Sequence, residues 1–490
     1  MSSFRDEASA DLVRSADDLL RQGRYAEAIG VYSRALEIEP ALPDAWFNLA
    51  WAQRAERRFD EALTSYGQAI AQGVEKPEEA LLNRATIFSE YMFQPARAVN
   101  ELQAALMRNP DYVPALLNLA NVHEDLGVVE DALAGYRRVL TLEPGNGRAH
   151  ARLGALQVLS GQPGAAVAAL KAALPLAPSV EARAEILFSL GSALDGVGDY
   201  HDAFQAFEAA NMHARAAAPE AYDPIGQQEM TDRVIETFST AQPIPRKENS
   251  PDAPRDPDQQ PVFICGMFRS GSTLVEQILG RHDAITAGGE LDYIPALVRK
   301  LQPYPEVTAA LPDAVVATLR DEYVRGLPGT GFVTDKRSDN FLHIGLIKQL
   351  FPNAKIIHTV RQPLDNLLSV YFLHFGHEIS YGYSLPEVAH FYIQYRRAMN
   401  HFRTLYAADI HDVDYDALVA SPRETIARSL DFLGLPWDEK CLTPAKADGA
   451  IRTPSAWQTR KPLHRLSSGR WRNYEDKLGT VRKMLAEAGL

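Results

Sequence analysis

A sequence pattern of nearly constant length occurs six times in the first part of the chain. A small residue after a turn recurs every 34 to 37 residues, and each stands four positions before an aromatic residue or Leu; these are Ala28, Ala62, Ala98, Ala132, Ala166 and Ala203. A period of about 34 residues is typical of two-helix units. One helical hairpin cannot bury its own apolar face, so such units must stack. We therefore predict an all-α superhelix of about six units over residues 1–215.

The segments around these alanines resemble a known repeat. GRYAEAIGVYSRALEIEP and GVVEDALAGYRRVLTLEP are similar to the second helix of a tetratricopeptide unit, and prolines at 40, 110, 144 and 178 stop such helices. The third unit departs from the pattern, because Phe93 and Pro95 stand where a turn glycine is usual. The resemblance implies a concave surface that binds a protein or peptide. A structural spacer and a homodimer surface are the alternatives.

Length and composition limit the classes of protein that fit this chain. At 490 residues it is too long for a single core. The net charge of -13 argues against a general nucleic-acid binder. Cys265 and Cys441 are too few for a disulfide framework, and no run of about 18 uncharged apolar residues is present. We expect a cytoplasmic protein that does not enter a membrane.

The pattern of apolar residues changes after a proline-rich segment. Residues 241–260 contain five prolines and almost no large apolar side chain, so we interpret residues 216–260 as a connecting helix and linker. Beyond it, short apolar runs such as PVFICGMF and KIIHTVR alternate with helix-like stretches. This alternation predicts an α/β domain with a mainly parallel sheet over residues 261–490.

The first of these strands leads into a glycine-containing turn. The strand Val262–Gly266 is followed by MFRSGST and an amphipathic helix, an arrangement that points backbone N–H groups at an anion. The spacing of Gly266 and Gly271 is that of a nucleotide triphosphatase loop, but Ser272 replaces the lysine that such enzymes need. Arg269 offers a basic group instead.

This loop resembles that of PAPS-dependent sulfotransferases, in which PAPS is 3′-phosphoadenosine-5′-phosphosulfate. FICGMFRSGSTLVEQIL is similar to the phosphosulfate loop of tyrosylprotein sulfotransferases, which reads R-S-G-T-T-L. The resemblance implies an α/β P-loop-like domain that moves a sulfuryl group to a hydroxyl acceptor without a metal. It also implies that the 5′-phosphosulfate is held by Arg269, Ser270, Gly271, Ser272 and Thr273.

A second segment resembles the family's 3′-phosphate site. In NAKIIHTVRQPLDNLLSVYF, Ser369 follows Arg361 by eight residues, as in the family. The tyrosylprotein enzymes carry a further arginine four residues later, where this chain has Leu373. One contact to the 3′-phosphate is therefore absent or comes from elsewhere.

Transfer to a hydroxyl requires a base for its proton. Glu290 follows Arg269 by 21 residues, which is the placement of the catalytic glutamate in the resembled family. Asp292 is the nearest rival, and Glu290 is alternatively a helix cap.

Four further roles are implied by the same resemblance. Lys336 matches a transition-state cation and Tyr415 a neighbour of the nucleotide. Ser455, six residues before Lys461, matches a serine that acts on the transition state, and Arg470 takes the place of a late nucleotide-binding lysine.

Two other functions stay open at this point. A P-loop kinase is disfavoured by Ser272, and a tetratricopeptide scaffold with a nucleotide-binding but non-catalytic domain is disfavoured by the presence of Glu290, Lys336 and Ser455. His374 and His377 have no third metal ligand nearby in the sequence. The acceptor itself, whether protein tyrosine, carbohydrate, lipid or small molecule, is not specified by these motifs.

Overall fold

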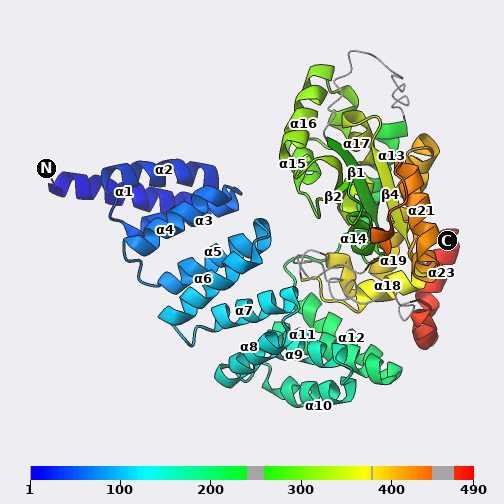
Figure 1. Cartoon of the computed structure of the whole chain (residues 1–490), viewed down its shortest axis with the longest axis horizontal. Coiled ribbons are helices and arrows are strands. Elements are labelled where there is room, and N and C mark those ends of the chain that lie inside the picture. The colour runs from blue at the N-terminus through cyan, green and yellow to red at the C-terminus, as the bar shows by residue number, and fades with distance from the viewer. Residues whose placement is uncertain (1, 240–258, 377–378, 444–467) are drawn as a thin grey trace. The chain divides into compact units, whose positions relative to one another are not determined.

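The computed structural model describes residues 2–239, 259–376, 379–443 and 468–490. The chain divides into two compact units, one up to Pro178 and the other from Ser179 onward (Figure 1).

The first unit is a succession of helical hairpins, as the repeat predicted. Consecutive helices pair as α1 with α2, α3 with α4, and so on to α9 with α10. Their bounds are α1 Ser2–Arg21, α2 Tyr25–Ile38, α3 Pro43–Ala55, α4 Phe59–Ala71, α5 Pro77–Thr86, α6 Pro95–Arg108, α7 Val113–Leu126, α8 Val129–Leu142, α9 Gly147–Leu159 and α10 Pro163–Ala173, followed by a 3₁₀-helix at Leu174–Leu176.

The repeating alanines are buried inside their helical hairpins, and all six have no exposed surface. Paired helices lie close together: a Cβ atom placed on Gly135 of α8 would stand 2.8 Å from the Cβ atom of Ala120 on α7. A larger side chain at these positions would force the helices apart, which explains why the pattern requires small residues.

The third unit is irregular, in agreement with its sequence. Helix α5 continues into a π-helical segment at Ile87–Tyr91, and Phe93 takes a positive φ of 53° in the turn. The backbone N–H of Gln94 donates to the carbonyl of Phe88 at 2.8 Å and closes this longer turn, after which Pro95 begins α6. Phe93 thus occupies a backbone conformation that glycine adopts in the turns at Gly23, Gly127 and Gly161.

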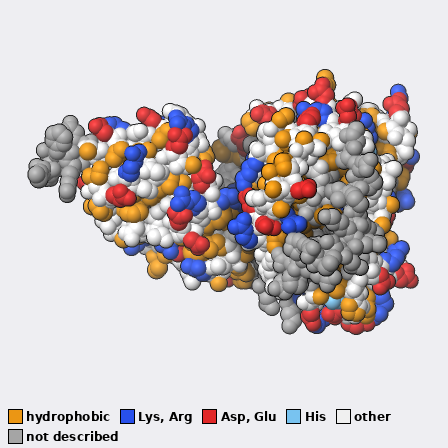
Figure 2. Space-filling view, turned by 90° about the horizontal axis from the view of Figure 1, so that it is seen from above, with side chains coloured by type: hydrophobic (Ala, Val, Ile, Leu, Met, Phe, Trp, Pro, Cys, Tyr) orange, Lys and Arg blue, Asp and Glu red, His pale blue; other side chains and the backbone are white. Residues whose placement is uncertain are grey.

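Charges of both signs cover the visible face of the array. Lys and Arg side chains are interspersed with Asp and Glu side chains there (Figure 2). Some of them are paired within a helical turn, such as Arg24 with Glu27 and Arg58 with Glu61. These pairs are exposed, so each contributes little to stability.

The second unit begins with one more helical hairpin. Helices α11 (Val180–Val197) and α12 (Tyr200–Ala217) pack against each other and are followed by α13 (Pro224–Ser239). The sequence places the end of the repeat array at residue 215, whereas the structure groups this sixth hairpin with the C-terminal unit. The hairpin keeps the repeat's buried Ala203.

A five-stranded sheet forms the centre of the second unit, and the predicted parallel sheet is confirmed. The strand order is β2-β3-β1-β4-β5, and every pairing is parallel. The strands are β1 Gln259–Gly266, β2 Ile285–Ala287, β3 Gly331–Lys336, β4 Lys355–Val360 and β5 Ile410–Asp414. Because all strands run the same way, the residues that follow them gather at one edge of the sheet.

Helices cover both faces of this sheet (Figure 1). Ile264 of β1 packs with Val275, Leu418 and Ile426, which lie on α14, α20 and α21. Phe263 points the other way, toward Tyr323 of α16. The remaining bounds are α14 Ser272–Leu279, α15 Tyr293–Lys300, α16 Asp313–Gly326, α17 Ile344–Leu350, α18 Pro363–Tyr371, α19 Leu385–Tyr406, α20 Tyr415–Ala420, α21 Pro422–Leu433 and α23 Gly479–Glu487, with 3₁₀-helices at Glu306–Ala310, Ser338–His343, Ser380–Tyr383, Glu439–Leu442 and Arg470–Lys477.

Aromatic side chains join the first hairpin of this unit to the end of α18. The ring of Phe207 stacks on that of Phe372 with centroids 4.0 Å apart, and Phe204 lies beside Tyr371. The side-chain amide of Asn211 donates to the carbonyl of Tyr371 at 2.9 Å. These contacts fix the position of the helix that carries Ser369.

No helix in the part of the chain that the structure describes is both long enough and apolar enough to cross a bilayer.

Replacing Phe207 by Ala should destabilise the second unit. Phe207 is fully buried, so its loss leaves a cavity against Phe372. The free energy of unfolding of this unit should fall by about 3 kcal/mol or more, as measured by urea denaturation. Met212 on the same helix is 62% exposed and provides the control, because Met212→Ala should stay within about 0.5 kcal/mol of the unaltered protein. Equal effects of the two substitutions would contradict this packing.

Candidate functional site

The turn after β1 has a backbone that only particular residues permit. Gly266 and Gly271 have φ values of 151° and 106°. A Cβ atom on Gly266 would lie 2.4 Å from the carbonyl oxygen of Thr359, and one on Gly271 would lie 2.8 Å from Cδ2 of Tyr415. The hydroxyl of Ser270 shares a hydrogen bond of 2.6 Å with the hydroxyl of Thr359. The turn is therefore held tightly against β4, with the first residues of α14 behind it.

Arg269, at the tip of this turn, meets the two residues expected at the 3′-phosphate site. Its Nε atom donates to Oγ of Ser369 at 3.1 Å, and Nη1 of Arg361 donates to the carbonyl of Arg269 at 3.3 Å. Arg269 itself has a positive φ of 67°, which is unusual for a residue with a side chain. Asn366 of α18 also donates to the carbonyl of Phe268 at 2.8 Å. The loop and α18 thus form one hydrogen-bonded unit.

Three guanidinium groups line a single cavity of about 130 Å³. They belong to Arg269, Arg361 and Arg470, and the wall is completed by Ser192, Asp365, Leu368, Ser369, Phe372 and Leu373. Burial, together with the charges of Arg361 and Arg470, lowers the pKa of Arg269 to about 10. Burial also lowers the pKa of Arg361. Concentrated positive charge in a partly closed cavity fits a multiply charged anion.

Arg470 lies near the position at which the resembled family has an arginine that this chain lacks. Leu373, which stands at the place of that arginine, lines the same cavity as Arg470. Arg470 therefore brings a guanidinium group to the cavity from a different segment of the chain.

Two aspartates hold the segment that carries Arg470. Asp365 is buried and accepts hydrogen bonds from the backbone N–H groups of Gly469 at 2.5 Å and Trp471 at 2.7 Å. Asp195 of α11 accepts from Nε of Arg470 at 3.1 Å and pairs with its Nη2 at 3.0 Å. Sequence reasoning missed both aspartates, because Asp195 precedes its partner by 275 residues and no local motif marks either of them.

Lys336 and Glu290 form an ion pair at the ends of β3 and β2. The side chain of Lys336 is 2% exposed, whereas that of Glu290 is 55% exposed. A hydrogen bond of 2.8 Å from the backbone N–H of Lys336 to the carbonyl of Gly289 fixes the two strand ends together. A buried amine thus meets a carboxylate that faces solvent, which is the arrangement needed for a base that an incoming acceptor can reach.

The structure bears on the two alternatives considered for this segment, a helix cap at Glu290 and Asp292 as the base. Helix α15 begins at Tyr293 with Asp292 as its N-terminal flanking residue, so Glu290 is not its cap. Asp292 pairs with Arg299 at 2.7 Å. Of the two carboxylates, Glu290 is the one beside Lys336.

Glu276 of α14 is a further carboxylate that sequence reasoning missed. Its Oε1 atom accepts hydrogen bonds from the backbone N–H of Gly289 at 2.9 Å and from the hydroxyl of Thr334 at 2.6 Å. Burial raises its pKa, while the charge of Lys336 acts in the opposite direction. Glu276 therefore supports the turn that presents Glu290.

The remaining expected residues are distributed as follows. Tyr415 begins α20, and the guanidinium of Arg361 lies 4.8 Å from the centre of its ring. Ser272 and Thr273 are buried at the start of α14.

Ser455 lies outside the described residues, as does His377. His374 stacks on Phe188 with ring centroids 5.2 Å apart. In the described residues no group of three or more His, Cys, Asp and Glu side chains is arranged to hold a metal ion.

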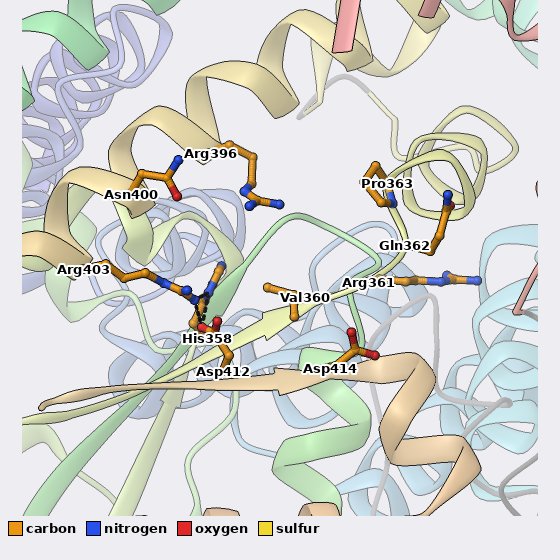
Figure 3. A pocket seen from close by; sticks show the side chains of 10 residues that line it. All are labelled: His358, Val360, Arg361, Gln362, Pro363, Arg396, Asn400, Arg403, Asp412 and Asp414. Carbon is orange, nitrogen blue, oxygen red and sulfur yellow. Dashed lines mark hydrogen bonds and ion pairs between the residues drawn. The ribbon is translucent and has the colours of Figure 1, made fainter. Parts of the chain in front are cut away.

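A second cavity, of about 270 Å³, lies at the ends of β4 and β5 (Figure 3). Arg403 forms an ion pair with Asp412, whose carboxylate is also 2.8 Å from Nδ1 of His358. Burial lowers the pKa of His358 well below its usual value, which favours the neutral ring. Figure 3 shows the side chain of Arg361 directed away from this group. Arg361 lines both this cavity and the one that also holds Arg269.

Family models match both the helical repeats and the domain with the parallel sheet. Residues 261–439 match the model described as the sulfotransferase family. Residues 13–86, 93–147 and 117–181 match the tetratricopeptide repeat model. The chain thus carries a tetratricopeptide-repeat region followed by a sulfotransferase-family domain.

Individual relatives cover different shares of the chain. A protein of Aquifex aeolicus described as uncharacterized is 29% identical over 417 residues, 80% of this chain and 52% of its own length. Protein-tyrosine sulfotransferase 1 of Danio rerio is 26% identical over 201 residues, 38% of this chain and 56% of its own length. This chain thus spans about half the length of the curated relatives it matches. The solved structure of PilW, a type IV pilus biogenesis factor, is 23% identical and has a TM-score of 0.34, with 41% of this chain and 90% of that chain covered.

Asp335 should make the stability of the protein depend on pH. Burial raises the pKa of its carboxyl group to about 7. Hydrogen bonds from Tyr323 and Asn340 favour the ionised form and oppose this rise only in part. As pH rises from about 4 to about 7, the unfolded chain loses this proton and the folded chain keeps it, so the free energy of unfolding falls. Above pH 7 the full cost of a buried carboxylate is present.

Urea denaturation at several pH values will test this dependence. In Asp335→Asn the fall between pH 4 and pH 7 should be smaller than in the unaltered protein, because the amide does not titrate. The exposed Asp313, on the neighbouring α16, provides the control. Parallel pH profiles for the unaltered protein and Asp335→Asn would show that Asp335 is not the responsible group.

Proposed function

We propose that this protein is a PAPS-dependent sulfotransferase that moves a sulfuryl group to a hydroxyl acceptor. The observation that carries the proposal is the convergence of Arg269, Arg361 and Arg470 on one cavity, with the Lys336–Glu290 pair at neighbouring strand ends. A nucleotide with a 5′-phosphosulfate and a 3′-phosphate has anionic groups at two separated points. A phosphate loop and an arginine-lined cavity that adjoins it at Arg269 fit such a nucleotide.

The residues divide into two groups that bind the nucleotide. We assign the 5′-phosphosulfate to the loop residues Arg269, Ser270, Gly271, Ser272 and Thr273. The 3′-phosphate is assigned to Arg361, Ser369 and Arg470, which line or adjoin the cavity beside the loop. Tyr415 is the neighbour of the nucleoside. PAPS supplies the sulfuryl group that is transferred.

The chemical roles rest on the pair at the strand ends. Glu290 takes the proton of the acceptor hydroxyl, since its carboxylate is exposed and is oriented by Lys336. Lys336 and Arg269 offset the negative charge that spreads over the transferring group, as cations do in phosphoryl transfer. Ser455 is assigned a supporting role at the transition state by the family resemblance alone.

The acceptor is proposed to be a protein or peptide tyrosine, selected or presented by the repeat array. The similarity to protein-tyrosine sulfotransferase 1 of Danio rerio and the tetratricopeptide match support this choice. Carbohydrate, lipid and small-molecule hydroxyls are the other acceptor classes. We place the protein in the cytoplasm. A homodimer through the repeats is the alternative use of the array.

Calorimetry should distinguish the proposed nucleotide from a triphosphate. The loop has Ser272 where a triphosphatase has lysine, and an arginine-lined cavity adjoins it. Adenosine 3′,5′-bisphosphate should therefore bind at least about tenfold more tightly than ATP, a difference of about 1.4 kcal/mol. Tight binding of ATP with none of the bisphosphate would favour a P-loop kinase and end the proposal.

Replacing the base should slow transfer without weakening nucleotide binding. Glu290→Gln should lower kcat with radiolabelled PAPS and a tyrosine peptide by about 10²–10⁴-fold. Its affinity for adenosine 3′,5′-bisphosphate should stay unchanged. Asp292→Asn, two residues away, is the matched control and should transfer label at close to the normal rate. A Glu290→Gln protein that is fully active would assign the base elsewhere, and no transfer by the unaltered protein to any hydroxyl class would favour a nucleotide-binding scaffold.

A further inference from the structure

The cavity of the three arginines is not built from the sulfotransferase-family segment alone. The family model matches residues 261–439, whereas Ser192 of α11 also lines the cavity. Helix α11 belongs to a hairpin that keeps the repeat spacing of the N-terminal array and packs within the C-terminal unit. One wall of the cavity therefore comes from a helix of the repeat pattern.

The contact from α11 to the cavity is a two-point clamp. Oδ1 of Asp195 accepts from Nε of Arg470, and Oδ2 pairs with Nη2 of the same guanidinium, at 3.1 and 3.0 Å. The hydroxyl of Tyr474 also donates to Oδ1. Phe372 lies beneath the guanidinium, 5.0 Å from ring centre to Cζ. A planar guanidinium held along one edge and over one face has little freedom to rotate.

We propose that Asp195 is a positioning residue of the nucleotide site, which holds Arg470 in place for the 3′-phosphate. This inference rests on the proposed function. Arg470 would supply a cation to the cavity wall to which Leu373 brings none, and α11 would fix its direction. The sixth hairpin is then a required part of the binding site and not only the last turn of a repeat array.

Two effects of Asp195 oppose each other, and their sum can be measured. Its negative charge lies near the cavity and repels a phosphate, so its removal by itself would tighten binding. Its clamp on Arg470 keeps a donor directed at the phosphate, so its loss would weaken binding. We expect the clamp to dominate. In Asp195→Asn, an amide N–H₂ group replaces one acceptor oxygen. This donor then faces the donors of Arg470 or Tyr474, so one hydrogen bond of the clamp is lost.

The experiment compares two nucleotides by calorimetry on the full chain. Asp195→Asn should bind adenosine 3′,5′-bisphosphate about tenfold more weakly, the scale of a hydrogen bond to a charged group. Its affinity for adenosine 5′-monophosphate, which lacks the 3′-phosphate, should be unchanged. General damage to the fold would weaken both. Asp195→Glu should recover part of the preference, and Glu208→Gln, an exposed change on α12, should leave it intact.

A double substitution separates positioning from other roles. In the background of Arg470→Ala, Asp195→Asn should cause no further loss of affinity for the bisphosphate, because its partner is already gone. An additive loss in the double variant, or an unchanged preference or tighter binding of the bisphosphate in Asp195→Asn alone, would overturn the inference. An unaltered protein that does not prefer the bisphosphate over the monophosphate would instead overturn the proposed function.

Discussion

The C-terminal unit has to hold three guanidinium groups close together. Arg269, Arg361 and Arg470 line one small cavity, and burial together with their mutual repulsion lowers the pKa of Arg269. Such a cluster is unfavourable unless the surrounding structure holds it. Here Asp365 holds the backbone on both sides of Arg470, and Asp195 holds its side chain. The carboxylates of Asp195 and Asp365 thus offset part of the positive charge of the three arginines.

The parallel sheet makes this arrangement possible. Arg269 lies in the turn after β1, Arg361 directly follows β4, and Lys336 ends β3. All three strand ends lie at the same edge because the sheet is parallel. Successive side chains of a strand point to opposite faces of the sheet, so the neighbouring residues Asp335 and Lys336 of β3 point in opposite directions. Asp335 contacts Tyr323 of α16, whereas Lys336 pairs with Glu290. Neighbouring residues of one strand thus serve the core on one face and the site on the other.

Sequence reasoning worked where the information was local. The alanine spacing predicted the hairpins, because close helix packing tolerates only small residues at those points. The loop between Gly266 and Thr273 and the pair Arg361 and Ser369 were found because each is a short segment with a fixed spacing. The structure brings Arg269 and Ser369 into hydrogen-bond contact. The assigned roles in binding and catalysis stay predictions.

Sequence reasoning failed where a contact joins distant segments. Glu276 supports the turn before Glu290 by accepting from Gly289, yet in sequence it is one polar residue of an amphipathic helix. Asp365 reads as an ordinary acidic residue in the first turn of α18, although its carboxylate accepts two backbone N–H groups from residues 469–471. Nothing in the spacing of such residues distinguishes them from solvated charges.

The sixth hairpin shows why a repeat pattern alone does not define a domain. Ala203 is buried as in the other units, so the rule for packing within the hairpin is the same. What differs is the outer surface, where Phe204 and Phe207 contact Tyr371 and Phe372. The repeat period reflects only how the two helices of a hairpin pack on each other. The residues on the outer face of the hairpin determine which unit of the chain it packs with. Because the hairpin also carries Asp195 toward Arg470, it holds one of the three arginines that line the cavity in the sulfotransferase-family domain's unit.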